Sequence, residues 1–442
     1  MIVVFKTILS LFIKDPILFI KNLNIENIAK LRTAINQESP ALISQNMSSY
    51  FDKSKTHPDE IDVAKVAKFV GQYKEAINEK KEVILFIGHE ATLTGAPLIL
   101  LKAIEEIKKK NDIFPVVILC KDGVLEKEYK KLGLVYTLPN HRNPSIDNKE
   151  LDGLLNKVND IKKISKAIFN SVESRRILKV VRKHTSKLTY LIHELGNLYP
   201  KNAWNIIDKN SDKIVFPAEF VKRKAIENNS FDLSKLSVQA QGLLKPRLLN
   251  RNKSEARKEI RDKLKLPANA IIILGAGTGI PRKGIDFFTS IALSVLPKTE
   301  QPIYFIWLGE MPINDYKYWI EKDIEHSGYS DRILLLGEQK ETENYFCASD
   351  LFLMTSRGDP FPCVVQEAVA SGLFIIGYQN VGGFTDLIDQ NNGVLLPYGD
   401  VHGAVEVILN KDWSDINSNL EAAKKKLNSM ESYAEYLYNT LT

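Results

Sequence analysis

Two series of short apolar segments, separated by longer helical patterns, constrain this sequence more than any other feature. Each segment has the length of a strand and is apolar on both faces, which is typical of a parallel sheet covered by helices on both sides. The first series comprises residues 83–87, 115–120, 134–138, 166–170, 188–192 and 213–217, and the second comprises residues 270–277, 303–309, 332–337, 351–356, 373–378 and 393–397. The sequence therefore predicts an α/β protein with two successive Rossmann-like domains.

A charged stretch at residues 243–268, with a proline near each end, separates the two series. We interpret it as an interdomain linker followed by one solvated helix. Ligands of such sheets bind beyond the carboxyl ends of the strands, so a cleft between two facing domains is the expected site. The expected organisation is a helical N-terminal extension at 1–80, one Rossmann-like domain at 81–245, a second at 246–425 and a C-terminal helix at 426–442.

The start of the chain, residues 1–20, is strongly apolar, but Lys6, Lys14, Asp15 and Pro16 interrupt it. The uninterrupted runs are shorter than the roughly 20 residues that a membrane-spanning helix needs, and a signal peptide is not expected. Two interpretations of residues 1–25 remain open: a helix packed on the protein or on another subunit, and an interfacial segment at the inner face of the membrane. We expect a cytoplasmic protein, either soluble or peripheral at the inner face of the plasma membrane.

Composition argues against several classes of protein. The formal net charge of +6 is spread over many Lys and Glu residues without a basic stripe interleaved with aromatic residues, so no nucleic-acid partner is expected. The three cysteines form no C-x-x-C pair, which argues against a disulfide framework and a structural zinc site. Neither His89-Glu90 nor His193-Glu194 continues into H-E-x-x-H, so a metalloprotease is excluded and no metal site is expected.

The segment GAGTGIPRKG, Gly275–Gly284, follows the first apolar run of the second series. Its glycines, among them Gly277 beside Thr278, let backbone N–H groups approach a phosphate. Arg282 and Lys283 add two cations within reach of a diphosphate. The spacing fits neither the dinucleotide fingerprint nor a Walker loop. A tight turn with a solvated basic pair remains the alternative interpretation.

A second group of candidate residues, at 356–368, follows another predicted strand. Asp359 lies in the loop and Glu367 lies about one turn into the helix, so both carboxylates can face one cleft and accept hydrogen bonds from vicinal hydroxyls of a sugar or a ribose. The helix opens at Phe361-Pro362-Cys363-Val364, whose free backbone N–H groups suit a phosphate. The alternative makes Asp359 a helix N-cap and Glu367 the partner of a nearby lysine. His89 or His193 could hydrogen-bond the sugar or the acceptor, and a structural role for either is equally open.

Together these segments resemble family 4 of the retaining glycosyltransferases, which have the GT-B fold. That family carries an E-x7-E signature, and this chain has Asp359-x7-Glu367, with aspartate in the first place. SRGDPFPCVVQEAVASG, followed by VGGFTDLI, is similar to the version in many bacterial surface-polysaccharide transferases. GHEATLTGAP at 88–97 resembles the first loop of the family, His193-Glu194 its histidine loop, and GAGTGIPRKG its diphosphate loop. The resemblance covers roughly residues 83–425.

The resemblance implies roles for these residues. Gly95 would approach the donor phosphates, which Arg282 and Lys283 would neutralise. Glu367 would bind the ribose hydroxyls and Asp359 the transferred sugar, although the shorter aspartate leaves its sugar contact open. The remaining implied positions are His193 at the reaction centre and His89, Glu90 and Glu194 on the acceptor side.

The implied enzyme retains anomeric configuration and needs neither metal nor cofactor. The first domain would bind a glycan or lipid-linked acceptor, and the second would bind the nucleotide-sugar donor, with a UDP-sugar as the first guess. The last helix would pack back on the first domain, with Trp413, Tyr433, Tyr436 and Tyr438 fixing the two domains together.

We therefore predict a glycosyltransferase that builds a bacterial cell-surface polysaccharide or glycoconjugate. Two alternatives remain: a non-catalytic partner subunit that kept the GT-B fold, and a sugar-nucleotide epimerase or phosphorylase on the same fold. A phosphorylase would need a cofactor lysine that the sequence does not place, and free UDP as a product would separate transfer from epimerisation.

Overall fold

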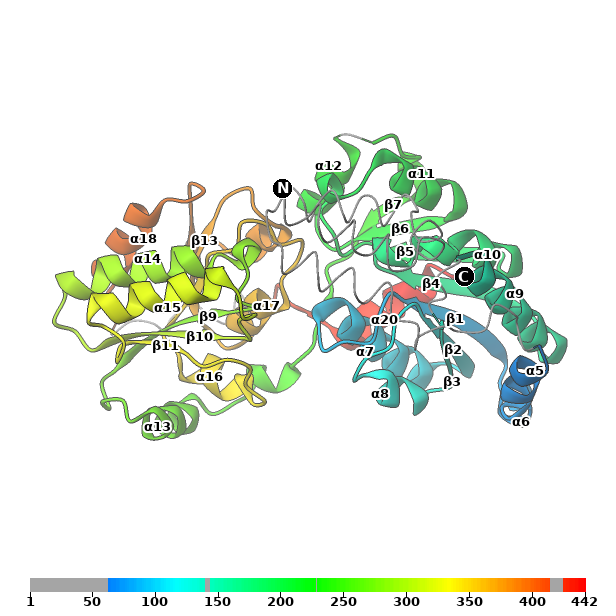
Figure 1. The fold of residues 1–442 in the computed structure, drawn as a ribbon, viewed down its shortest axis with the longest axis horizontal. Helices are drawn as coiled ribbons and strands as arrows, with labels where there is room; N and C mark the ends of the chain where they lie inside the picture. Colours follow the sequence, from blue (N-terminus) through cyan, green and yellow to red (C-terminus); the bar gives the residue numbers. More distant parts are fainter. Residues whose placement is uncertain (1–62, 140–143, 228, 414–423) are drawn as a thin grey trace, which may run out of the picture. The chain divides into compact units, whose positions relative to one another are not determined.

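A computed structural model describes residues 63–139, 144–227, 229–413 and 424–442 (Figure 1). Most of the predicted N-terminal extension, including both interpretations of residues 1–25, lies outside the described residues. Its described end is helical, as predicted: α5 spans Val63–Gly71 and α6 spans Lys74–Glu79. Among the described residues, no helix combines the length and apolarity needed to cross a membrane.

The first sheet has seven parallel strands in the order β3-β2-β1-β4-β5-β6-β7. Each run of the first predicted series falls on one of them. The bounds are β1 Glu82–Gly88, β2 Ile113–Leu119, β3 Leu134–Thr137, β4 Ile164–Asn170, β5 Lys187–Leu191, β6 Lys213–Phe216 and β7 Leu236–Val238. The sequence missed β7, because this three-residue edge strand is only partly buried and has no long apolar run.

The second sheet has six parallel strands in the order β11-β10-β9-β12-β13-β14. All six runs of the second series are confirmed. The bounds are β9 Ile271–Ala276, β10 Ile303–Leu308, β11 Ile333–Leu335, β12 Leu351–Met354, β13 Phe374–Tyr378 and β14 Gly393–Leu396. In both sheets the strand order reverses beside the first strand, β1 or β9, which is where open α/β sheets bind their ligands.

Helices connect the strands of both sheets. Those of the first are α7 Gly95–Lys110, α8 Glu126–Lys130, α9 Pro144–Ile161, α10 Leu178–His184, α11 Lys201–Asn210 and α12 Glu219–Ile226. Those of the second are α13 Lys253–Leu264, α14 Ile285–Val295, α15 Asp315–Ser327, α16 Thr342–Ala348, α17 Cys363–Ala370 and α18 Val401–Leu409.

Helix α13 is not the solvated helix that the sequence predicted. Ala256, Ile260 and Arg261 are buried, and α13 packs along α16. Its high charge comes from the face that these residues leave to solvent, so the composition indicated a helix but not its buried face.

The chain crosses between the two sheets twice, and the two crossings pair with each other. β8, Gly242–Leu243, forms a short parallel pair with β15, Asn428–Ser429. The final helix α20, Met430–Asn439, then packs on α7 of the first domain, as the resemblance implied (Figure 1).

The predicted contribution of four aromatic residues to this docking is only partly correct. Tyr433 is buried against the first domain, and Tyr436 and Tyr438 pack against the same cluster. The Tyr438 hydroxyl also donates to Glu82 at 2.6 Å. Trp413 does not take part, because it packs with the core of the second domain.

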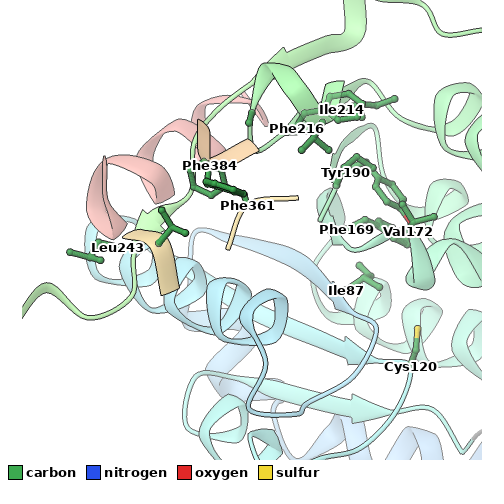
Figure 2. Close-up of a cluster of buried hydrophobic side chains, with 14 of the residues drawn as sticks. Ile87, Cys120, Phe169, Val172, Tyr190, Ile214, Phe216, Leu243, Phe361 and Phe384 are labelled. Atoms are coloured by element: carbon green, nitrogen blue, oxygen red, sulfur yellow. The ribbon is translucent and has the colours of Figure 1, made fainter. Parts of the chain in front are cut away.

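One cluster of buried apolar side chains includes residues from both domains (Figure 2). Phe216 is the last residue of β6 in the first sheet, Leu243 lies in the crossing segment, and Phe361 and Phe384 come from loops of the second sheet. Apolar side chains at the carboxyl ends of both sheets therefore pack together, and this packing holds the loops of the candidate site next to each other.

Candidate functional site

The glycine-rich loop after β9 has the backbone that close approach requires. Gly284 has φ of 72°, and a Cβ there would overlap the Thr355 carbonyl oxygen. Gly277 has φ of 142°, and the aliphatic stem of Lys283 packs 3.2–3.4 Å from the place where its Cβ would be. Only glycine adopts these left-handed conformations without a large energetic cost. With glycine at both positions, the Lys283 side chain can lie across the loop.

The two motifs singled out from the sequence are hydrogen-bonded to each other. The Arg357 N–H donates to the Arg282 carbonyl at 2.8 Å, and the Arg282 guanidinium donates to the Gly358 carbonyl at 2.9 Å. The Thr355 hydroxyl donates to the Lys283 carbonyl at 3.3 Å. The predicted diphosphate loop and the predicted sugar-binding loop therefore form one site.

Asp359 lies between the two predicted cations. The Lys283 ammonium forms an ion pair with its carboxylate, and Arg282 Nη1 lies 3.5 Å from Oδ2. Asp359 is only 6% exposed, and its N–H donates to the Val381 carbonyl at 2.9 Å. It is not a helix N-cap, because Pro362 occupies that position in α17. Two cations beside one carboxylate leave a net positive charge in the loop.

The N-termini of α7 and α17 meet at this site. A Cβ on Gly95, the first residue of α7, would lie 3.4 Å from Sγ of Cys363, the first residue of α17. The cap residues Thr94 and Pro362 supply no side-chain acceptor to either first turn. Among the described residues, two helix N-termini without a side-chain cap therefore lie close together, which favours an anion. We call this pair, with Arg282 and Lys283, the paired-helix site.

Cys363 is an unreactive part of this site. Burial, with Glu367 and Asp359 nearby, raises the pKa of its thiol to about 12. The thiol is therefore neutral at physiological pH and is a poor nucleophile. The residues around it, Phe361 and Val364, are buried and half-buried, so the predicted row from Phe361 to Val364 offers backbone rather than side-chain polarity.

Glu367 lies on α17 and is 5% exposed. Lys245 Nζ is 3.2 Å from both Oε1 and Oε2 of Glu367, and it donates to the Thr342 hydroxyl at 2.6 Å. Burial raises the pKa of Glu367, and Lys245 offsets part of that rise. Glu367 thus pairs with a lysine, as the alternative interpretation had it. The same ion pair orients its carboxylate next to the paired-helix site.

The predicted catalytic residue His193 has both ring nitrogens occupied. Its Nδ1 accepts from the Gln241 amide at 2.7 Å, and its Nε2–H donates to Asn170 Oδ1 at 2.6 Å. Asn170 in turn donates to the Ala96 carbonyl at 3.0 Å, in the first turn of α7. Burial lowers the pKa of His193 to about 3, so the ring is neutral. This chain of hydrogen bonds joins the crossing segment to α7 and suits an orienting role for His193.

Glu194 is likewise occupied by its own loop. It accepts hydrogen bonds from the Ser171 hydroxyl, from Val172 N–H at 3.1 Å and from His193 N–H at 2.9 Å. Burial raises its pKa, and these three donors counteract the rise. Its carboxylate therefore connects the loop after β4 to the loop after β5 through hydrogen bonds.

His89 and Glu90 follow β1 and lie beside each other. His89 Nε2 lies 3.6 Å from Glu90 Oε1, and Thr92 donates to the same carboxylate oxygen at 2.7 Å. Within the described part of the chain, His89 Nδ1 is buried and has no hydrogen-bond partner. Burial lowers the pKa of His89, so its unpaired nitrogen belongs to a neutral ring. The predicted acceptor-side histidine thus keeps one free polar atom.

Sequence reasoning missed Lys245, Gln241 and Asn170. Lys245 and Gln241 lie in or beside a stretch interpreted as a linker, and Asn170 ends an apolar strand. No motif distinguishes them, and only the fold brings them to Glu367 and His193. Among the residues that the structure describes, no group of His, Cys, Asp or Glu is arranged to hold a metal ion.

Comparison with known families identifies the second half of the chain. Residues 256–426 match the family model described as glycosyl transferases group 1. These residues form a group 1 glycosyltransferase domain. The match covers the loop Gly275–Gly284 and both carboxylates, Asp359 and Glu367, but not the first sheet.

Some of the curated relatives are named for the synthesis of bacterial surface glycans. The lipopolysaccharide core biosynthesis glycosyltransferase LpsE of Rhizobium meliloti is 30% identical over 149 residues, which are 34% of this chain and 41% of the relative. The UDP-Gal:alpha-D-GlcNAc-diphosphoundecaprenol alpha-1,3-galactosyltransferase of Escherichia coli is 26% identical over 161 residues, 36% of this chain and 40% of the relative. The chain spans about two fifths of the length of these relatives.

Solved structures extend the likeness to both sheets. Anabaena Alr3699/HepE, crystallised with UDP and glucose, matches with a TM-score of 0.66 at 19% identity, covering 81% of this chain and 98% of that one. WaaG, a glycosyltransferase involved in lipopolysaccharide biosynthesis, matches with a TM-score of 0.62 at 13% identity, covering 81% of this chain and 99% of that one. The two sheets together, with the group 1 domain as the second of them, therefore have the predicted GT-B fold. The narrower assignment to family 4 stays a prediction.

Proposed function

We propose that this protein is a retaining glycosyltransferase that moves a sugar from a nucleoside diphosphate sugar to a hydroxyl acceptor. The observation that carries the proposal is the paired-helix site, where two uncapped helix N-termini and two cations surround one place. A diphosphate carries the charge that such a site binds. The group 1 match and the relatives' names support the same reaction class.

In the proposed reaction the acceptor oxygen bonds to the anomeric carbon while the bond from that carbon to the diphosphate breaks. Negative charge grows on the leaving diphosphate, and the Lys283 ammonium and the helix N–H groups stabilise it without reorganising. The leaving diphosphate takes the acceptor proton. Asp359 would hold the sugar hydroxyls, and Glu367 the ribose hydroxyls. His193, with both nitrogens occupied, would orient the first turn of α7 rather than carry a proton.

We further propose that the product is a bacterial cell-surface polysaccharide or glycoconjugate. The relatives of known role support this, because LpsE is named for the lipopolysaccharide core and the Escherichia coli enzyme for a diphosphoundecaprenol-linked sugar. The acceptor would be a glycan or a lipid-linked saccharide, bound near the free nitrogen of His89. If the acceptor is lipid-linked, the enzyme would act at the inner face of the membrane.

Two rival functions remain testable. A non-catalytic partner subunit would keep the fold but neither bind nor consume a donor. An epimerase would convert one sugar nucleotide into another without releasing a nucleoside diphosphate. Release of a free nucleoside diphosphate as a product separates transfer from epimerisation.

A thermal-shift screen against UDP-, GDP-, dTDP- and CMP-sugars tests the proposal. A donor at 100 times its Kd adds about 2.7 kcal/mol of stability, and Asp359→Asn should reduce the shift for the intact donor more than for the free nucleoside diphosphate. Lys298→Gln, an exposed lysine after α14, is the matched control. If no donor raises the melting temperature of the wild type, the proposal is wrong.

A further inference from the structure

A lysine of the crossing segment, rather than of either sheet, faces the buried carboxylate of α17. Lys245 lies between β8 and the turn Pro246–Leu249, and its ammonium is equidistant, at 3.2 Å, from the two oxygens of Glu367. The Thr342 hydroxyl, at the start of α16, accepts a third contact at 2.6 Å. One ammonium therefore bridges two helices of the second domain from a segment that leads to the first.

The backbone on both sides holds Lys245 in place. Gly242 lies so close to Met430 that a Cβ would come well inside 3.0 Å of its backbone, and the pairing of β8 with β15 fixes this approach. Pro246 follows Lys245 directly and restricts its backbone. The ammonium is thus delivered by a rigid segment and not by a mobile surface chain.

Within the described residues, Lys245 is the one cation that lowers the pKa of Glu367. Burial raises this pKa most, and Glu343 of α16 raises it further. On the same helix the nearest titratable group is the neutral Cys363 thiol. Without that ammonium, a buried carboxyl beside another acid favours its protonated form.

We propose that Lys245 is a positioning residue of the donor site: by bridging both oxygens of Glu367, it keeps that carboxylate oriented to accept the two ribose hydroxyls of the nucleotide. The inference rests on the proposed function. It makes the crossing segment part of the nucleotide site, so that ribose binding depends on a residue outside the group 1 domain.

The expected consequences concern ribose recognition and its dependence on pH. In Lys245→Met the pKa of Glu367 should rise further, because burial and Glu343 are no longer opposed by the ammonium, so more of the carboxyl is protonated at any given pH. The ribose preference of the variant should therefore be weaker than that of the wild type, and more so at the low end of the pH range than at the high end. Lys245→Arg keeps a cation in place and should keep the wild-type profile.

Titration calorimetry of UDP and GDP, each against its 2′-deoxy counterpart, tests the inference between pH 6.5 and 9. The wild type should prefer the ribose form by about tenfold or more, as expected for hydrogen bonds to a charged group. Lys245→Met should lose most of this preference at the low end of the range and recover part of it as pH rises. A purely structural lysine would instead lower both affinities equally.

Lys253→Met is the matched control. Lys253 follows the same crossing segment, but donates to the Gly372 carbonyl, just beyond α17, at 3.2 Å and does not contact Glu367. It should leave the ribose preference unchanged. The inference is overturned if Lys245→Met, with a wild-type far-ultraviolet spectrum, keeps the ribose preference and pH profile of the wild type, or if the wild type binds the deoxy form equally well. A wild type that binds no nucleoside diphosphate overturns the proposed function itself.

Discussion

Lys283 and Arg282 are adjacent cations in one loop, but we expect them to contribute unequally to the free energy of diphosphate binding. The side chain of Lys283 is 15% exposed and packs across Gly277, whereas that of Arg282 is 44% exposed. A charge-assisted hydrogen bond from Lys283 to a diphosphate should contribute about 1.5–3 kcal/mol, which corresponds to roughly 10–150-fold in affinity. Solvent screening limits Arg282 to about 0–1 kcal/mol.

Replacing Lys283 with Met should also lower the stability of the protein. Asp359 would lose its nearest cation while staying buried, with only Arg282 at 3.5 Å left to compensate. Leaving one member of a buried pair unpaired costs up to about 3–5 kcal/mol, and the remaining Arg282 should reduce this to about 1–3 kcal/mol. The double variant Lys283→Met/Asp359→Asn should therefore recover stability without recovering diphosphate affinity.

Urea unfolding gives the stability of each variant, and calorimetric titration with a nucleoside diphosphate gives its affinity. Lys298→Met, an exposed lysine in the turn after α14, controls for the general loss of positive charge. The reasoning is refuted if Lys283→Met binds the diphosphate within twofold of the wild type, or if Arg282→Met loses more affinity than Lys283→Met.

Three further outcomes follow from the described contacts. Gly284→Ala should lower the free energy of unfolding by about 2–4 kcal/mol, because the new Cβ would add overlap with a backbone oxygen to the strain of a left-handed residue. The matched variant Gly328→Ala has a similar φ of 77° but open space around it, so it should cost only about 1 kcal/mol. Urea titrations measure both values. His193 has a folded pKa of about 3 against 6.5 unfolded, so the unfolded chain binds the extra proton and stability is lost as pH falls from 6.5 towards 3. His193→Gln should make the fall shallower by up to about 1.4 kcal/mol per pH unit, and equal slopes would contradict a buried neutral ring. Tyr433→Ala should cost about 3–5 kcal/mol and expose α20 to limited proteolysis before the second sheet is cut; simultaneous cleavage would argue against its docking on α7.

The strand positions and the two loops of the candidate site could be predicted from the sequence because each depends on neighbouring residues. A buried parallel strand needs an unbroken apolar run, and a loop that approaches a phosphate needs glycines and cations at short spacing. The glycines of Gly275–Gly284 and the Asp359-x7-Glu367 spacing therefore located one site, which the structure brings together through direct hydrogen bonds.

The features that the sequence missed depend on tertiary contacts. Lys245 and Gln241 reach Glu367 and His193 only because the crossing segment runs back between the two domains. Trp413 was assigned to interdomain docking because the last helix of the GT-B fold was expected to cross back, but it precedes that helix, α20, and packs with the core of the second domain.

Titration of UDP, GDP and dTDP, each beside its parent nucleoside, tests the paired-helix site most directly. A site built from two helix N-termini and the Lys283 ammonium should bind at least one nucleoside diphosphate about 100-fold more tightly than the nucleoside, and the difference should shrink as salt rises. If nucleoside and nucleoside diphosphate bind equally well, or if no nucleotide binds at any salt concentration, the diphosphate is not held at Gly95, Cys363 and Lys283.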